Sequence, residues 1–204
     1  NHTIDDFSWA FMSDFLEVDF DGLVVNAGNI TEILDKRIPE KKELWGFLAE
    51  VNSPKNGLLD VDDSWQDSSS SKLTDEGVTD PEELTKLLDK YNNNEVVGFS
   101  FPITIKKKNQ IGAGRSTKLL GTRLKVFLQK PANAIKMKQE LFLRKWLIIS
   151  GENSIRPNAR VLGVTLIDSP ALSEFCAYAE LPDHRKFSHE KIQLNERYTK
   201  TRDT

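Results

Sequence analysis

Lysine and arginine, which can bind an anion, are concentrated in one stretch of this chain. Between Lys106 and Lys145 there are twelve lysines and arginines but only one acidic residue, Glu140. Lysine and arginine neutralise phosphates, so we predict that this stretch binds nucleic acid or an acidic protein surface. The predicted contact residues are Lys106, Lys107, Lys108, Arg115, Lys118, Arg123, Lys125, Lys130, Lys136, Lys138, Arg144 and Lys145.

Three phenylalanines lie among or beside these cations: Phe99, Phe101 and Phe127. If their rings are exposed, they can stack on nucleic-acid bases. If they belong to the core, the cations form an ordinary solvated face. The sequence leaves both interpretations open.

A glycine-rich segment within this stretch is the nearest approach to a phosphate-binding loop. A Walker loop needs Gly-Lys-Ser/Thr at a turn from a strand into a helix, and no glycine precedes Lys118. A dinucleotide fingerprint needs a third glycine after Gly112 and Gly114, at the position that Thr117 occupies. A hairpin turn explains both glycines more simply, so we do not expect nucleotide hydrolysis.

Other catalytic patterns are also incomplete. Asp168 and Glu180 have a separation that suits a metal-dependent nuclease, but Pro182 stands where such enzymes place a lysine. The three histidines and Cys176, the one cysteine, match no metal or nucleophile spacing. We therefore predict no catalytic residue, no metal site and no cofactor. The sequence favours a binding protein but leaves enzymatic activity open.

The two halves of the chain carry opposite charge. Residues 1–100 have 22 acidic and 8 basic side chains, whereas residues 101–204 have 9 acidic and 20 basic ones. Such asymmetry indicates either an acidic partner or an electrostatic contact between the halves, within one molecule or between two copies.

The N-terminal residues 1–52 are predicted to be helical. Over 4–20, three phenylalanines recur at helical spacing, and they either pack in the core or dock on a protein partner: Phe7, Phe11 and Phe15. Further helices are expected over 31–36 and 40–51, the latter with Pro39 at its first position.

Residues 53–80 differ in composition, since they are rich in Ser, Asp and Gly, and we predict an acidic flexible linker or loop there. From Pro81 a helix is expected to run to about residue 92. Strands over 95–105 and 118–129 are predicted to form a hairpin with a long basic tip over 106–117.

After the hairpin we predict a helix from Pro131 to about Ile149, a strand over 160–167 and a helix from Pro170 to Leu181. Residues 183–204 are expected to be a polar tail or a surface helix. The fold class is therefore α+β, in which a small antiparallel or mixed sheet packs with helices over 81–182.

We thus predict a non-enzymatic module that contacts RNA or DNA through 106–145. The alternative is an assembly or scaffold protein that self-associates, or docks a protein partner, through its aromatic N-terminal helix and its charge asymmetry.

The longest apolar run, Phe175–Ala179, is too short to span a bilayer, which takes about 20 residues. With one cysteine no intrachain disulfide can form, and we expect an intracellular location, in the cytoplasm or nucleus.

Overall fold

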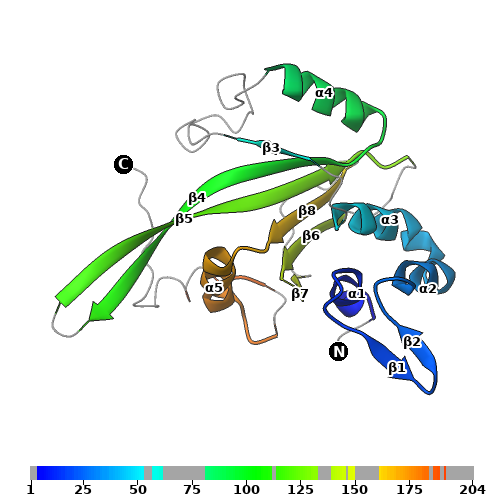
Figure 1. Ribbon diagram of the computed structural model, residues 1–204, viewed down its shortest axis with the longest axis horizontal. Helices are drawn as coiled ribbons and strands as arrows, with labels where there is room; N and C mark the ends of the chain where they lie inside the picture. The colour runs from blue at the N-terminus through cyan, green and yellow to red at the C-terminus, as the bar shows by residue number, and fades with distance from the viewer. Residues whose placement is uncertain are drawn as a thin grey trace.

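The longest feature of the computed structural model is a ladder of two antiparallel strands (Figure 1). Strand β4 (Val97–Ile111) pairs with β5 (Gly114–Gln129), from Val97 opposite Leu128 to Ile111 opposite Gly114. The structure describes residues 4–52, 57–61, 81–111, 114–132, 139–145, 147–149, 161–183, 186–188 and 191. Because residues 106–111 pair with residues 114–119, most of the predicted 106–117 tip belongs to the ladder.

The two long strands belong to a six-stranded mixed sheet with the order β3-β4-β5-β8-β6-β7. Strand β3 (Leu58–Asp60) runs parallel to β4, and β8 (Leu162–Ile167) runs antiparallel to β5. Strand β6 (Gln139–Arg144) runs parallel to β8 and antiparallel to β7 (Leu147–Ile149). With the helices described below, this sheet confirms the predicted α+β class.

The helix predicted from Pro131 to Ile149 is wrong, because β6 and β7 occupy its second half. Leu141 and Leu143 pack in the core from one face of β6, while Phe142 between them contacts Phe187 on the other. A strand that is covered on both faces lacks an alternation of polar and apolar residues, so its sequence is easily read as a helix.

The N-terminal residues form helices and one small hairpin. Helix α1 (Ile4–Met12) ends eight residues before the predicted boundary at residue 20, and a hairpin follows, made of β1 (Val18–Phe20) and β2 (Leu23–Val25). Helix α2 (Ile30–Arg37), the 3-10 turn η1 (Pro39–Lys41) and helix α3 (Lys42–Val51) come next. The indole Nε1 of Trp9 donates a hydrogen bond to the Lys145 carbonyl at 2.8 Å, which ties α1 to the turn between β6 and β7.

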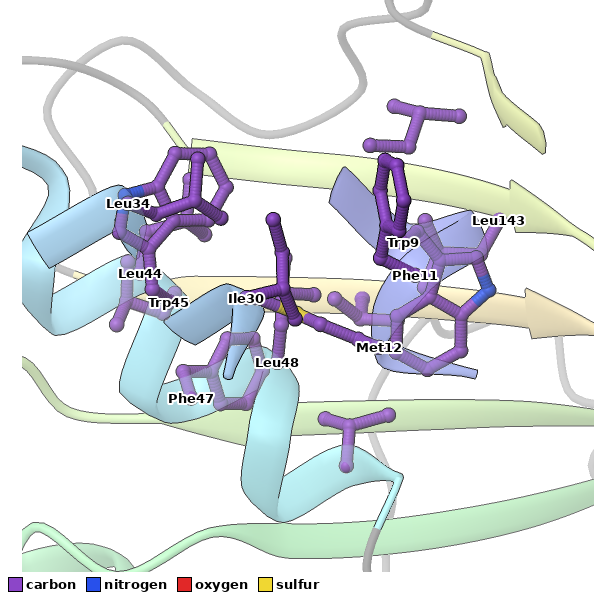
Figure 2. Packing of buried hydrophobic residues seen from close by; sticks show 14 of the residues in the cluster. Trp9, Phe11, Met12, Ile30, Leu34, Leu44, Trp45, Phe47, Leu48 and Leu143 are labelled. Atoms are coloured by element: carbon purple, nitrogen blue, oxygen red, sulfur yellow. The ribbon is translucent and has the colours of Figure 1, made fainter. Parts of the chain in front are cut away.

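The main hydrophobic core lies between α1–α3 and one face of the sheet. Trp9 and Phe11 of α1 belong to one cluster with Ile30 of α2, Leu48 of α3 and Leu143 of the sheet (Figure 2). Burying each such side chain contributes roughly 1.5–3 kcal/mol. This core therefore fixes the N-terminal helices on the sheet.

Helices α4 and α5 cover the other face. Successive strand residues point to opposite faces, and Leu128 lies in a second cluster whereas its neighbour Phe127 lies in the main core. The second cluster joins α4 (Pro81–Asn92) to β3 and β4, and a third joins α5 (Pro170–Ala179) to β4, β5 and β8. Helix α5 begins at Pro170, as the sequence predicts, and the Oγ of the N-cap residue Ser169 accepts a hydrogen bond from the Leu172 amide.

Two predicted segments lie largely outside the described residues. Within 53–80, only 57–61 are described, and they include β3, which is paired with β4. Within 183–204, residues 183, 186–188 and 191 are described, and Phe187 pairs with Glu180 in a β-bridge. No helix in the described ranges is long and apolar enough to cross a membrane.

The packing around Gly98 gives a direct test of this fold. A Cβ atom at Gly98 would lie 2.7 Å from Leu58 Cδ2 and 3.0 Å from the Phe127 ring. We expect Gly98→Ala to lower the free energy of unfolding by about 1–3 kcal/mol, because the added methyl group overpacks this contact. The measurement is denaturant unfolding monitored by circular dichroism.

Gly121→Ala is the matched control, because Gly121 lies in the same ladder with no atom within 4 Å of its would-be Cβ. It should leave the unfolding midpoint nearly unchanged. Equal losses for the two variants would contradict the close contact of β3, β4 and β5 at Gly98.

Candidate functional site

Part of the β4–β5 ladder extends beyond the rest of the sheet. Strand β8 pairs with β5 only over Lys125–Gln129, and the two long strands continue as a two-stranded ribbon (Figure 1). We call residues 103–111 and 114–124 the basic arm. The basic arm contains no Asp or Glu, and it contains six cationic residues: Lys106, Lys107, Lys108, Arg115, Lys118 and Arg123.

Two lysines face each other across the middle of the basic arm. Lys107 lies directly opposite Lys118, an arrangement in which like charges repel. Glu174 of α5 partly offsets this repulsion, since its carboxylate oxygens lie 2.7 and 2.9 Å from the Lys107 Nζ. Lys118 is exposed and has no ion pair within the described part of the chain. The middle of the basic arm therefore holds a net positive charge.

Lys106 lies next to this pair, opposite Leu119, whose side chain is exposed. Lys108 and Arg115 are farther out, where the backbone pairs them with Thr117 and Gln110. Backbone pairing thus brings five of the twelve predicted cations, those at 106, 107, 108, 115 and 118, into one ribbon.

Arg123 and Lys125 have a different environment at the base of the ribbon. The Arg123 guanidinium donates to the Ser100 carbonyl at 2.8 Å and lies 2.9 Å from an Asp60 carboxylate oxygen. The Lys125 Nζ lies 2.5 Å from Asp168 Oδ2. These contacts join β5 to β3 and to the end of β8, so both cations stabilise the sheet.

Arg144 forms the most buried ion pair among the described residues. Its Nε and Nη2 both donate to the Glu180 carboxylate, the latter at 2.7 Å. The side chains are 12% and 1% exposed, respectively. The Glu180 carbonyl also accepts from Lys191 Nζ at 2.5 Å. Arg144, predicted to face a partner, instead fixes the end of α5 on β6.

The remaining predicted cations are not gathered on the basic arm. Lys130 follows β5 at the end away from the arm, and Lys145 lies in the turn between β6 and β7. Both are exposed. Lys136 and Lys138 lie outside the described residues. Among the described residues, the predicted contact residues therefore do not all lie on the basic arm.

The aromatic residues beside the cations belong to the core. Phe99 and Phe127 are buried, and Phe101 packs against the cluster beneath α4. The rings of Phe99 and Phe127 are therefore not exposed for stacking on a base, whereas the ring of Phe101 is half-buried. For Phe99 and Phe127 the core interpretation holds.

The three N-terminal phenylalanines also separate. Phe11 is buried in the main core, whereas Phe7 and Phe15 are exposed, Phe15 by 61%. Phe15 follows the end of α1, so the helical spacing that relates the three residues stops before it. Leu23 and Val24 of β2 are exposed as well. Sequence reasoning did not single them out, because a three-residue strand is too short for its periodicity to be recognised.

Groups typical of catalytic and metal sites are sparse among the described residues. No group of three or more His, Cys, Asp or Glu there could hold a metal ion. Burial, with a smaller contribution from Glu180, raises the pKa of the Cys176 thiol to about 12, so this thiol is protonated at neutral pH.

Comparisons of the chain with protein-family models, with curated proteins and with solved structures found no match.

The buried Arg144–Glu180 pair predicts a large asymmetry between single and double variants. Arg144→Met removes the guanidinium from the buried Glu180 carboxylate, which should lower the free energy of unfolding by about 3–5 kcal/mol. Arg144→Met with Glu180→Leu should recover most of that loss, because no charge then remains buried. Denaturant unfolding of both variants measures the difference.

Lys36→Met is the control, since Lys36 pairs with Glu32 on an exposed helix face and its loss should have little effect. A single Arg144 variant as stable as this control would show that the buried pair does not hold α5 on the sheet.

Proposed function

We propose that this protein binds nucleic acid through the basic arm. The observation that supports the proposal is the arm itself, a two-stranded ribbon with six cations and no acid that continues past the last strand paired with β5. A ribbon of this kind presents positive charge at a distance from the acidic N-terminal half. Phosphate is the anion that nucleic acid offers at regular spacing along its backbone.

Ion pairs within the molecule engage several of the predicted contact cations, so we restrict the proposed contact surface to the basic arm. Arg123, Lys125 and Arg144 are each matched by a carboxylate of the same molecule. The lysines at the middle of the arm are not matched in full, since Glu174 contacts one of the two that face each other. A phosphate between Lys107 and Lys118 would relieve their repulsion, which supports an anionic partner.

A specific observation favours docking of a protein partner as a second candidate function. Four large apolar side chains between residues 7 and 24 are exposed: Phe7, Phe15, Leu23 and Val24. Exposed apolar side chains that lie together in a short segment are typical of protein–protein contacts. A second copy of the chain is the partner that the alternative predicts.

Removal of charge from the arm tests the first proposal. Lys106→Glu with Lys118→Glu should weaken binding to a mixed-sequence oligonucleotide by about a hundredfold at 50 mM salt, because two phosphate contacts become repulsive. The dependence of log K on log salt should lose about one unit of slope per lysine. Fluorescence anisotropy over a salt series measures both quantities.

The control is Lys86→Glu with Lys90→Glu, which makes the same charge change on the exposed face of α4. It should cost much less affinity. Equal losses would mean that net charge, and not the basic arm, determines binding, and no binding of the unaltered protein at low salt would reject the proposal.

Glu174→Gln should act in the opposite direction. Without the carboxylate, the Lys107 ammonium is released to a phosphate, and affinity for the oligonucleotide should rise severalfold. Glu95→Gln removes an exposed acid before β4, at the other end of the ladder, and serves as the matched control. Unchanged affinity in the Glu174 variant would place Lys107 outside the contact.

Light scattering tests the second candidate. If the N-terminal apolar residues mediate self-association, the protein should be oligomeric at high concentration, and Phe15→Ser with Leu23→Ser should yield a monomer. Deletion of α1 is not a fair test, because Trp9, Phe11 and Met12 are core residues. Leu88→Ser, at an exposed leucine of α4, is the control. A monomer at every concentration would reject self-association.

A further inference from the structure

One face of the basic arm is exposed around a leucine. Successive side chains of a strand point to opposite faces of the sheet, and Ile105 and its partner Leu120 point toward α5, in the third cluster. Lys106 and its partner Leu119 therefore point to the opposite face, where the Leu119 side chain is 60% exposed. Gly121, on the same face, is exposed and has no atom within 4 Å of its would-be Cβ. Lys106, Leu119 and Gly121 define what we call the open face of the arm.

Nucleic-acid phosphates do not account for the exposure of Leu119, because they offer no apolar surface to it. The neighbours of Leu119 are charged, since Lys118 precedes it in β5 and Lys106 lies opposite it in β4. Contacts between proteins join apolar centres that are enclosed by polar rims. The surface that matches the open face therefore has an exposed apolar side chain beside carboxylates.

The β1–β2 hairpin presents such a surface. Its inner face packs on the main core through Val18 and Val25, which lie opposite each other. On its outer face Val24 lies opposite Asp19, and the Val24 side chain is 38% exposed. Glu17 comes two residues before Asp19, and both acids are exposed. We call Glu17, Asp19 and Val24 the outer face of the hairpin.

The two acids of this outer face are not neutralised by a neighbouring cation. Glu17 Oε2 accepts a hydrogen bond from Asn26 Nδ2 at 2.9 Å, and Asp19 Oδ1 accepts one from the Gly22 amide at 2.7 Å. Both donors are uncharged, and neither acid forms an ion pair within the described part of the chain. The sequence contains no Lys or Arg before Lys36. The outer face therefore carries negative charge around an apolar side chain.

The open face and the outer face do not meet within one molecule. The β4–β5 ribbon and the β1–β2 hairpin lie at opposite ends of the structure (Figure 1). Two copies of the same face also match poorly, because lysine would then face lysine, or carboxylate would face carboxylate. The matching pair is the open face of one copy and the outer face of another. Two copies can exchange such contacts reciprocally, or the contact can join copies in a ring or a row.

We propose that the open face of the basic arm docks on the outer face of the hairpin in a second copy of this chain. Leu119 packs against Val24, while lysines of the arm lie beside carboxylates of the hairpin. The two ribbons pack face to face, at the spacing of about 10 Å that is usual for stacked sheets. This inference rests on the second candidate function, self-association, and names the surfaces that meet. Lys106 is also a proposed phosphate contact, so a second copy and nucleic acid compete for the arm.

Charge reversals on the two faces test the contact, by sedimentation velocity of the nuclease-treated full chain at about 50 mM salt. Lys106→Glu with Lys118→Glu should weaken self-association by at least about tenfold, because like charges then face each other. Glu17→Lys with Asp19→Lys should do the same. An equimolar mixture of the two variants should associate again, since the unaltered arm of one then meets the unaltered hairpin of the other. A mixture that stays monomeric would overturn the inference.

Two controls separate this contact from general effects of charge and apolar surface. Lys86→Glu with Lys90→Glu makes the same charge change on α4 and should associate like the unaltered protein. Leu119→Ser should weaken association by about tenfold through loss of the apolar contact, whereas Leu88→Ser on α4 should not. Equal effects of the two leucine variants would contradict a contact at the open face. Circular dichroism of each variant establishes that a loss of association is not a loss of folding.

This inference and the functions proposed above fail in different ways. If the Lys106/Lys118 variant associates like the unaltered protein while Phe15→Ser with Leu23→Ser does not, the copies meet through N-terminal apolar residues alone. Self-association then stands, and this inference is overturned. If the unaltered protein is a monomer at every concentration, both are rejected. Nucleic-acid binding is measured separately, by anisotropy at a concentration where the protein is monomeric, so neither result decides it.

Discussion

The continuous pairing of β4 with β5 is the constraint on which the rest of this structure depends. Fifteen residue pairs follow one register without a bulge, so the same two strands serve both the body and the arm. At one end their side chains enter the main core and the cluster beneath α4, through Phe127 and Phe99 respectively. A slip of one residue would exchange the two faces and remove both sets of contacts, so the core also fixes the register of the distal lysines.

Whether a cation of this ladder has a carboxylate partner depends on the elements that pack beside it. Where other elements pack against the strands, each cation has a carboxylate beside it, as with Arg123 and Asp60 or Lys125 and Asp168. The Arg144–Glu180 pair follows the same rule in the interior, where an unpaired charge would be costly. Farther out, Glu174 of α5 contacts Lys107. Of these four ion pairs, Arg123–Asp60 joins the two oppositely charged halves of the chain, and the other three lie within the basic half.

Local signals predicted the elements that have strong boundaries. Pro81 and the Ser169-Pro170 pair begin helices where the sequence placed them, because proline at a first helical position has a fixed φ and no amide to satisfy. The switch to β-branched residues before Val97 likewise marks a strand. The end of α1 and the strands β6 and β7 were missed, since tertiary pairing, not local pattern, decides them.

The sequence by itself determined the α+β class, the paired long strands and the concentration of cations between 106 and 145. Residue types, proline positions and periodicity carry that information locally. Only the tertiary structure decided which cations are available to a partner, because that depends on acids distant in sequence: Asp60 for Arg123, and Glu180 for Arg144. It also decided that Phe11, Phe99 and Phe127 are core residues, since burial depends on elements that pack from elsewhere in the chain.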